Sequence, residues 1–181
     1  MFYLLPVEQI EPAIQEEIVR FVVRIFRCET AVLAPMDMPE EAFDPDRKQY
    51  NATLIMRDII GRCPADTVRL LGVTEKDIFI PMLTYIFGQA QVEGPVAFLS
   101  LARLRQEFYG LPAYHDLLLS RILKETLHEL GHTFGLVHCL DPECAMSLSI
   151  NVGDIDNKMI ELCGSCHVRL QDKLDDLGCS K

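Results

Sequence analysis

The hydrophobic and polar positions of this chain fall into short apolar runs, typical of strands, and into stretches with the 3.6-residue period of amphipathic helices. The apolar runs predict strands at 2–7, 31–34, 77–87 and 96–102. The helical pattern predicts helices at 11–27, 49–62, 117–133 and 168–177. This alternating order indicates an α/β (α+β) fold. Its twisted, mixed and largely parallel sheet would be backed by helices, with the helix at 117–133 lying below it.

Length and composition fit one compact domain that does not cross a membrane. The chain has 181 residues, 49% of them hydrophobic, and a domain of this size buries about 70% of its unfolded surface. The longest apolar run, 78–87, has ten residues and contains Pro81. Because a membrane-spanning helix needs about 18 apolar residues, we interpret this run as a core strand.

Charge and the amino terminus narrow the range of partners. The formal net charge is −10 and there is no Lys/Arg cluster. Nucleic-acid binding depends on positive charge, so we expect no nucleic-acid partner. The first eight residues lack a basic start and include Pro6 and Glu8, a pattern unlike a signal peptide. We therefore expect a cytoplasmic monomer with no membrane partner and a loose tail at 178–181.

Residues 128–138, which read HELGHTFGLVH, carry the candidate chemistry. An α-helix turns about 100° per residue, so His128 and His132 share a face and can chelate one Zn²⁺, with Glu129 at the rim. Gly135 can adopt the left-handed conformation that ends a helix. The chain then turns back, so that His138 can bind the same ion as a third ligand. A bare His-Glu-x-x-His pattern also arises by chance, but the added glycine and histidine favour the metal. Three histidines leave one zinc position for water, as in catalytic sites.

Four cysteines follow with spacing typical of a second metal site. Cys139 and Cys144 form a C-x4-C pair, Cys163 and Cys166 form a C-x2-C pair, and 18 residues separate the pairs. This pattern matches a structural zinc held by four thiolates. Two disulfides are the alternative, and they require an oxidising compartment. We interpret the neighbouring His167 as a surface residue, because four cysteines already complete a tetrahedral site.

The combined pattern H-E-x-x-H-x-x-G-x-x-H-C-x4-C-x-M, followed by C-x-x-C, resembles the archaemetzincin family of metzincin metallopeptidases. The matching part, about 124–166, is roughly a quarter of the chain. The resemblance implies a zincin-like fold with two Zn²⁺ per chain. The catalytic ion would lie on His128, His132 and His138, and the structural ion on Cys139, Cys144, Cys163 and Cys166. It also implies that Glu129 is the general base and acid, and that Met146 forms the Met-turn, a hydrophobic floor below the catalytic ion.

We expect a single catalytic domain over 1–181 with two subdomains. The upper subdomain, about 1–135, would carry the active-site helix, and the lower one, about 136–181, would be mostly irregular and stabilised by zinc. Side chains of neighbouring residues in extended chain point to opposite sides. His138 can therefore face the catalytic ion while Cys139 faces the structural ion. The structural ion would replace the hydrophobic core that the short lower subdomain cannot form.

The predicted activity is hydrolysis of a peptide or protein substrate by zinc-activated water. Glu129 would take a proton from the water and pass it to the leaving amine. Some metzincins place a tyrosine soon after the Met-turn, but Ser147 follows Met146 here. The remaining candidates to stabilise the oxyanion are Tyr85, Tyr109 and Tyr114.

Substrate capture is predicted at the strand that includes residues 96–101. This strand lies where metzincins carry the edge strand that pairs with an extended peptide, and an ordinary core strand is the alternative. Two further functions fit the same residues: a zinc-stabilised peptide-binding protein with little turnover, and a zinc hydrolase acting on a non-peptide amide.

Overall fold

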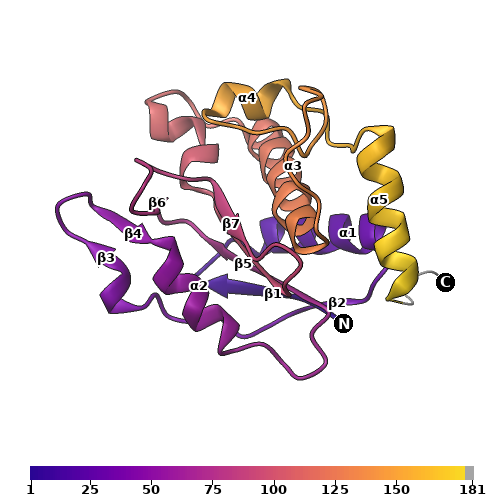
Figure 1. Cartoon of the computed structure of the whole chain (residues 1–181). Coiled ribbons are helices and arrows are strands. Elements are labelled where there is room, and N and C mark those ends of the chain that lie inside the picture. Colours follow the sequence, from indigo (N-terminus) through magenta and orange to yellow (C-terminus); the bar gives the residue numbers. More distant parts are fainter. Residues whose placement is uncertain (178–181) are drawn as a thin grey trace.

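The computed structural model describes residues 1–177; the tail expected at 178–181 lies outside the described residues. Its main sheet has the strand order β2-β1-β5-β8-β7 (Figure 1). The strands, in that order, are Thr30–Val32, Phe2–Val7, Arg69–Thr74, Val96–Ser100 and Gly88–Ala90. All neighbours run parallel except β7, which pairs antiparallel with β8 and forms one edge of the sheet. A small second sheet contains β3 (Phe43–Asp44), β4 (Gln49–Asn51) and β6 (Ile78–Phe79).

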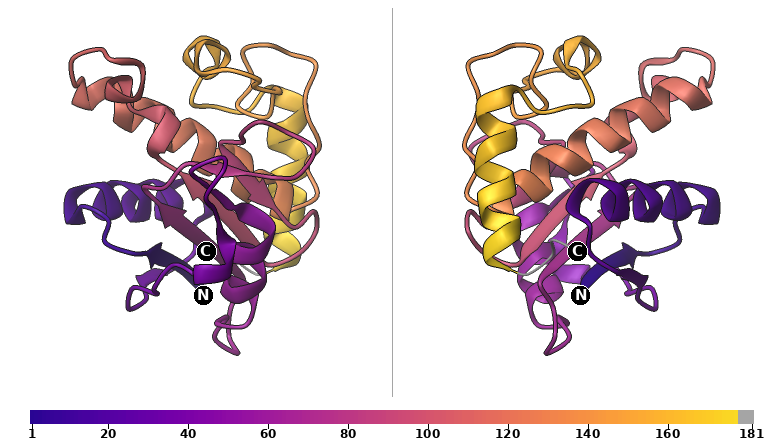
Figure 2. Two further views of the ribbon diagram at one scale, coloured as in Figure 1. Left: turned by 90° about the vertical axis from the view of Figure 1, so that its left-hand side faces the viewer. Right: turned by 90° about the vertical axis from the view of Figure 1, so that its right-hand side faces the viewer.

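Helices cover both faces of the main sheet (Figure 2). The buried residues of α1 (Pro12–Phe26) and α3 (His115–Thr133) share one core cluster with Phe2 and Leu4 of β1. Those of α2 (Ala52–Ile60) share a second cluster with Leu5 and Val7. Alternate residues of β1 thus point to opposite cores, as the period of a strand requires. Three short 3₁₀ helices occupy Glu40–Ala42, Ala102–Leu104 and Gln106–Tyr109.

Three aromatic rings join distant parts of the chain. The ring centroid of Phe26, at the end of α1, lies 5.4 Å from that of Phe2 and 5.5 Å from that of Phe134. The Arg69 guanidinium of β5 lies 4.1 Å above the Phe134 ring. The amino-terminal strand therefore packs against the end of the helix that carries the histidines.

The region after α3 contains two further helices, α4 (Val152–Asn157) and α5 (Gly164–Asp176). A capping box between Asn151 and Asp154 begins α4. Basic side chains of α3 bind this helix: Arg121 pairs with Asp156 through two bonds of 2.7 Å, and Lys124 donates to the Ile155 and Asp156 carbonyls at 3.0 Å. The short helix is therefore anchored by charged contacts to the histidine helix.

The predicted fold class is confirmed, but several strand predictions are wrong. The apolar run at 77–87 forms a strand only at Ile78–Phe79, and residues 83–87 line a cavity. The segment between the strands predicted at 77–87 and 96–102 contains β7, so β7 and not β8 is the edge strand. The central strand β5 was not predicted at all, because five of its six residues are buried and show no alternation.

The helix predictions are closer to the structure. The helices expected at 11–27 and 117–133 correspond to α1 and α3. The one expected at 49–62 begins with β4, and α2 starts only after Asn51, whose side chain accepts a bond from the Thr53 N–H. The helix α4 lies in a region that was expected to be irregular.

Candidate active site

The end of α3 turns the third histidine back towards the first two. Gly135 has φ +84°, and the N–H groups of Gly135 and Leu136 bind the carbonyls of His132 and Gly131 at 2.9 and 3.1 Å. This is the Schellman arrangement, in which a left-handed residue ends a helix. The chain then reverses, and His138 returns beside the helix as the sequence predicted.

The structure brings the three histidines together around one point. One nitrogen from each of His128, His132 and His138 lies within 4.8 Å of the others. The Nδ1 atoms of His128 and His132 contact the carbonyl oxygens of Ala145 and Leu136 at 2.9 and 2.8 Å. Because a carbonyl only accepts, both Nδ1 atoms carry the proton, and both Nε2 atoms present lone pairs.

Those two Nε2 atoms face each other at 3.1 Å. Two lone pairs at this distance repel unless a cation lies between them, so the geometry fits a metal. Burial lowers the pKa of all three histidines. The imidazoles are therefore neutral, which is the form that binds zinc.

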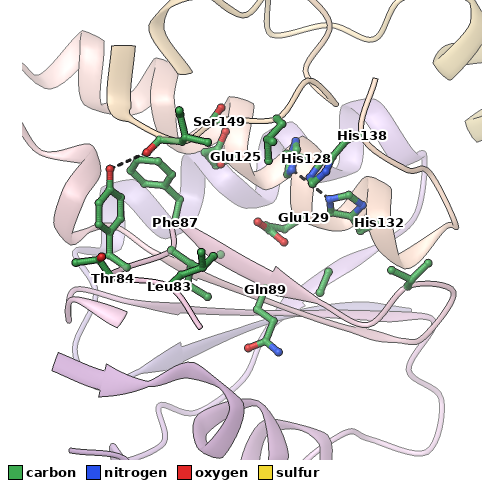
Figure 3. A pocket seen from close by; sticks show the side chains of 17 residues that line it. Leu83, Thr84, Phe87, Gln89, Glu125, His128, Glu129, His132, His138 and Ser149 are labelled. Atoms are coloured by element: carbon green, nitrogen blue, oxygen red, sulfur yellow. Dashed lines mark hydrogen bonds between the residues drawn. The ribbon is translucent and has the colours of Figure 1, made fainter. Parts of the chain in front are cut away.

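Glu129 lies beside the histidines and is almost fully buried, with 5% of the residue exposed. Burial and then the nearby Glu125 raise its pKa well above the ordinary value, while Lys158 acts in the opposite direction. A raised pKa suits a group that accepts a proton and later returns it. Figure 3 shows this carboxylate between the histidines and the strand that carries Gln89, whose side chain points away from it.

A buried ion pair lies behind the site and was not predicted from the sequence. The Lys158 ammonium, with 0% of its side chain exposed, lies 3.1 Å from the Glu125 carboxylate and 3.4 Å from His128 Nδ1. Burial raises the pKa of Glu125 although Lys158 lies alongside it. The pair joins the segment after α4 to the face of α3 that carries the histidines.

A cavity of about 620 Å³ opens between α3 and β7 (Figure 3). His128, Glu129, His132 and His138 form its polar end. The remaining walls are largely apolar and come from the segment after β6, from β7 and the loop after it, and from the segment after Met146, with Glu125 added from α3. Besides Glu125 they comprise Leu83, Thr84, Tyr85, Ile86, Phe87, Gly88, Gln89, Ala90, Val92, Leu148, Ser149 and Ile150. The space is large enough for side chains of a bound peptide.

Of the three candidate tyrosines, only Tyr85 lines the cavity. Its hydroxyl donates to the Ile150 carbonyl at 2.8 Å and so spans the two walls. The Tyr109 hydroxyl donates to the Arg103 carbonyl at 3.0 Å instead. Ser149 was not predicted to contribute, yet it lines the cavity, and its buried hydroxyl oxygen has no hydrogen-bond partner among the described residues.

The four predicted cysteines also come together. The sulfurs of Cys139, Cys144, Cys163 and Cys166 lie within 4.8 Å of one another, and the four residues form no disulfide. The Cys139 and Cys163 sulfurs are 3.7 Å apart, and two thiolates on one tetrahedral zinc at 2.3 Å would be about 3.8 Å apart. The disulfide alternative is therefore wrong, and the spacing fits a shared ion.

The protonation of this cluster follows from its backbone contacts. The Cys166 N–H donates to the Cys163 sulfur at the start of α5 and lowers the pKa of Cys163 to about 7. Burial raises the pKa of Cys144 and of Cys166. Cys144 and Cys166 therefore need a nearby cation to ionise near neutral pH.

Met146 lies between the two clusters and is fully buried. A Cβ atom added to Gly131 of α3 would lie 2.5 Å from the Met146 sulfur, so the methionine packs directly against the histidine helix. Next to it, the Cys139 N–H donates to the Met146 carbonyl at 2.9 Å. The neighbours His138 and Cys139 belong to different clusters, as the alternation of an extended chain predicted.

The two remaining histidines lie outside both clusters. His115 begins α3 and His167 lies on α5, and both are exposed. Neither belongs to a group of potential metal ligands. The interpretation of His167 as a surface residue is therefore consistent with the structure.

A helix that presents two histidines and a glutamate at the open edge of a sheet, with a third histidine beyond a glycine turn, characterises the metzincin class of zinc peptidases. Comparisons with known proteins agree. The profile of peptidase family M54 matches residues 19–172. The chain belongs to this family, the archaemetzincins, and is therefore a zinc-dependent metallopeptidase, as the sequence resemblance implied.

Relatives match over nearly the whole chain. An archaemetzincin of Methanocaldococcus jannaschii is 41% identical over 165 residues, 88% of this chain and 89% of the relative. The crystal structure of archaemetzincin from Methanopyrus kandleri is similar with a TM-score of 0.83 and 34% identity, over 96% of this chain and 94% of the other. The crystal structure of archaemetzincin from Archaeoglobus fulgidus, complexed with malonate, is similar with a TM-score of 0.80 and 32% identity, over 93% of this chain and 98% of the other. Among the described residues, no helix is both long and apolar enough to span a membrane.

Proposed function

We propose that His128, His132 and His138 hold the catalytic zinc ion and that Glu129 is the general base and acid of peptide hydrolysis. The observation that carries this proposal is the pair of Nε2 lone pairs 3.1 Å apart, next to a buried carboxylate in the same cavity. When bound there, zinc activates water and polarises the scissile carbonyl.

The roles of the protein groups follow from their positions. The Ala145 and Leu136 carbonyls fix the imidazole tautomers. Glu129, whose pKa is raised by burial, takes the proton of the attacking water and delivers it to the leaving amine. Met146 supports the helix from below by packing on Gly131.

The edge strand β7 is the proposed docking site for the substrate backbone. Phe87 and Gln91 bond to β8 through Ser100 N–H to Phe87 O and Gln91 N–H to Val96 O, at 2.8 and 2.9 Å. In an antiparallel pair, alternate residues bond to the partner strand. The N–H and C=O groups of Gly88 and Ala90 therefore point to the open edge, where an extended peptide can add a strand.

A second, structural zinc ion is proposed on Cys139, Cys144, Cys163 and Cys166, which makes two ions per chain. It would hold the lower subdomain, about 136–177 among the described residues, against the upper one. We further propose that the enzyme is a monomer of the cytoplasm, a compartment whose reducing surroundings keep such thiolates from oxidising.

The test compares the zinc-loaded protein with its Glu129→Gln variant on a peptide library. Gln is isosteric with Glu but cannot take a proton, so we expect about 10²–10⁴-fold slower cleavage, with two zinc ions per chain in both proteins. Mass spectrometry of the library and metal analysis provide the measurements. If the zinc-loaded variant cleaved peptides as fast as the wild-type protein, Glu129 would not be the general base and acid. Peptide binding without any cleavage would support the binding-protein alternative.

A further inference from the structure

Gly88 of β7 lies directly against the carboxylate of Glu129. A Cβ atom added to Gly88 would lie 2.6 Å from Cδ and 2.7 Å from Cγ of Glu129, and the three nearest heavy atoms all belong to this side chain. Real Cβ atoms do not approach other atoms so closely. Any residue larger than glycine would therefore displace the Glu129 side chain.

The backbone at this position does not itself require glycine. Among the described residues, Gly110 and Gly135 are the glycines with positive φ, so Gly88 has a conformation open to any residue. Its place in the strand is ordinary too, since it pairs with Leu99 of β8 in regular register. The absence of a side chain at Gly88 therefore serves to leave space for Glu129.

We propose that Gly88 is a positioning residue for the catalytic carboxylate. Its bare Cα lets Glu129 occupy the gap between the edge strand and the three histidines. The inference rests on the role proposed for Glu129. It predicts a specific kind of damage on substitution, because a flexible side chain can move away at little cost in stability but then loses its alignment. A shift of about 1 Å in a catalytic group can cost about 10²-fold in rate.

Gly72 of β5 provides a matched control in the same sheet. A Cβ atom there would lie 2.6 Å from Ile59 Cδ1 and 3.0 Å from Phe98 Cδ2, both in the core on the other face from α3. Gly72→Ala therefore adds the same atom but strains packing. We expect it to lower the melting temperature and leave the turnover of the folded enzyme unchanged.

The first measurement is made on the zinc-loaded Gly88→Ala enzyme with a peptide that the wild-type enzyme cleaves. We expect kcat to fall about 100-fold, with two zinc ions per chain and an unchanged melting temperature. In the Glu129→Gln background, the same substitution should cause no further loss, because the carboxylate it displaces is already absent. Unchanged kcat, or losses that multiply in the double variant, would overturn the proposal.

The second measurement does not depend on turnover. Acetohydroxamate chelates zinc, and the proton it releases passes to an adjacent carboxylate, so its affinity reports the position of Glu129. By calorimetry, Gly88→Ala and Glu129→Gln should each weaken binding about tenfold, and the double variant should bind no more weakly than Glu129→Gln alone. Wild-type affinity in Gly88→Ala would refute the positioning role. If the four proteins show these acetohydroxamate affinities but no peptide is cleaved, the proposed hydrolysis is wrong and the positioning of Glu129 by Gly88 stands.

Discussion

The histidine cluster and the cysteine cluster begin at adjacent residues, His138 and Cys139, yet they are positioned by opposite means. Two histidines and Glu129 lie on a 19-residue helix packed under the main sheet. Three of the four cysteines lie in irregular chain held mainly by turns, and the fourth, Cys166, lies in the first turn of α5. A packed scaffold aims the first set before any ion binds, whereas the ion proposed for the second set would itself hold those side chains in place.

The largest expected effect is at the cysteine cluster. Cys163→Ser should release the ion proposed there and destabilise the region around Met146, since structural zinc contributes on the order of 10 kcal/mol in small zinc-binding peptides. Activity should fall as well, because His138 loses its anchor. Zinc analysis and thermal unfolding provide the measurement. Cys63→Ser is the control, since Cys63 lies in the other core and should keep both ions. Two zinc ions and a wild-type melting temperature in Cys163→Ser would contradict the structural role.

The buried ion pair tests how far the two regions depend on each other. Lys158 belongs to the segment between the cysteine pairs, but its ammonium lies on the histidine helix beside Glu125. Lys158→Met leaves a buried carboxylate unpaired, which should cost about 3–5 kcal/mol in the free energy of unfolding. Adding Glu125→Leu should recover most of that loss. Denaturant titrations measure both variants, and a double variant no more stable than the single one would argue against a direct pair.

A smaller effect on stability is expected at the histidines. His132→Ala should abolish hydrolysis and remove one zinc ion while the cysteine-bound ion stays, because the two sets share no residue. A mild chelator should likewise strip the histidine-bound ion first, since that site opens onto the cavity. Metal analysis during the titration should show an intermediate with one zinc ion per chain. Loss of both ions in a single step would show that the regions are not independent.

The smallest expected effect is the pH dependence of the metal-free protein. Burial lowers the pKa of His128 well below its ordinary value of 6.5, so the unfolded chain binds more protons than the folded one as pH falls through 6.5. His128 should therefore make the free energy of unfolding decrease with falling pH, whereas Glu125 and Glu129, whose pKa values are raised by burial, act in the opposite direction. Urea titrations between pH 8 and about 5 measure the net slope, and His128→Gln should remove the histidine contribution from it. An equal slope in the variant would assign the dependence to other groups.

The sequence predicted the parts of the site that local geometry decides. The positions of His128 and His132 follow from helical spacing, and Gly135 does adopt the left-handed turn. The cysteine grouping follows from ligand spacing in the same way. These features need only a few neighbouring residues, so a pattern is enough to find them.

The missed features depend on tertiary contacts. The edge strand β7 contains Gly88 and Gln89, which have little strand propensity of their own, and it forms because β8 provides a partner. The apolar run at 78–87 predicts a core strand although residues 83–87 line the cavity, because a cavity wall and a core are equally hydrophobic in sequence. Lys158 carries no local sign that its partner lies 33 residues earlier in the chain.

The aromatic contact of Phe2 and Phe26 with Phe134 has a consequence for the order of events during synthesis. Phe134 immediately precedes the turn that returns His138, and its ring lies on residues made at the very beginning of the chain. The first strand must therefore wait until more than two thirds of the polypeptide has left the ribosome before this contact can form. His138 lies further along the chain than Phe134, so the zinc site proposed at the histidines cannot be complete before that stage of synthesis.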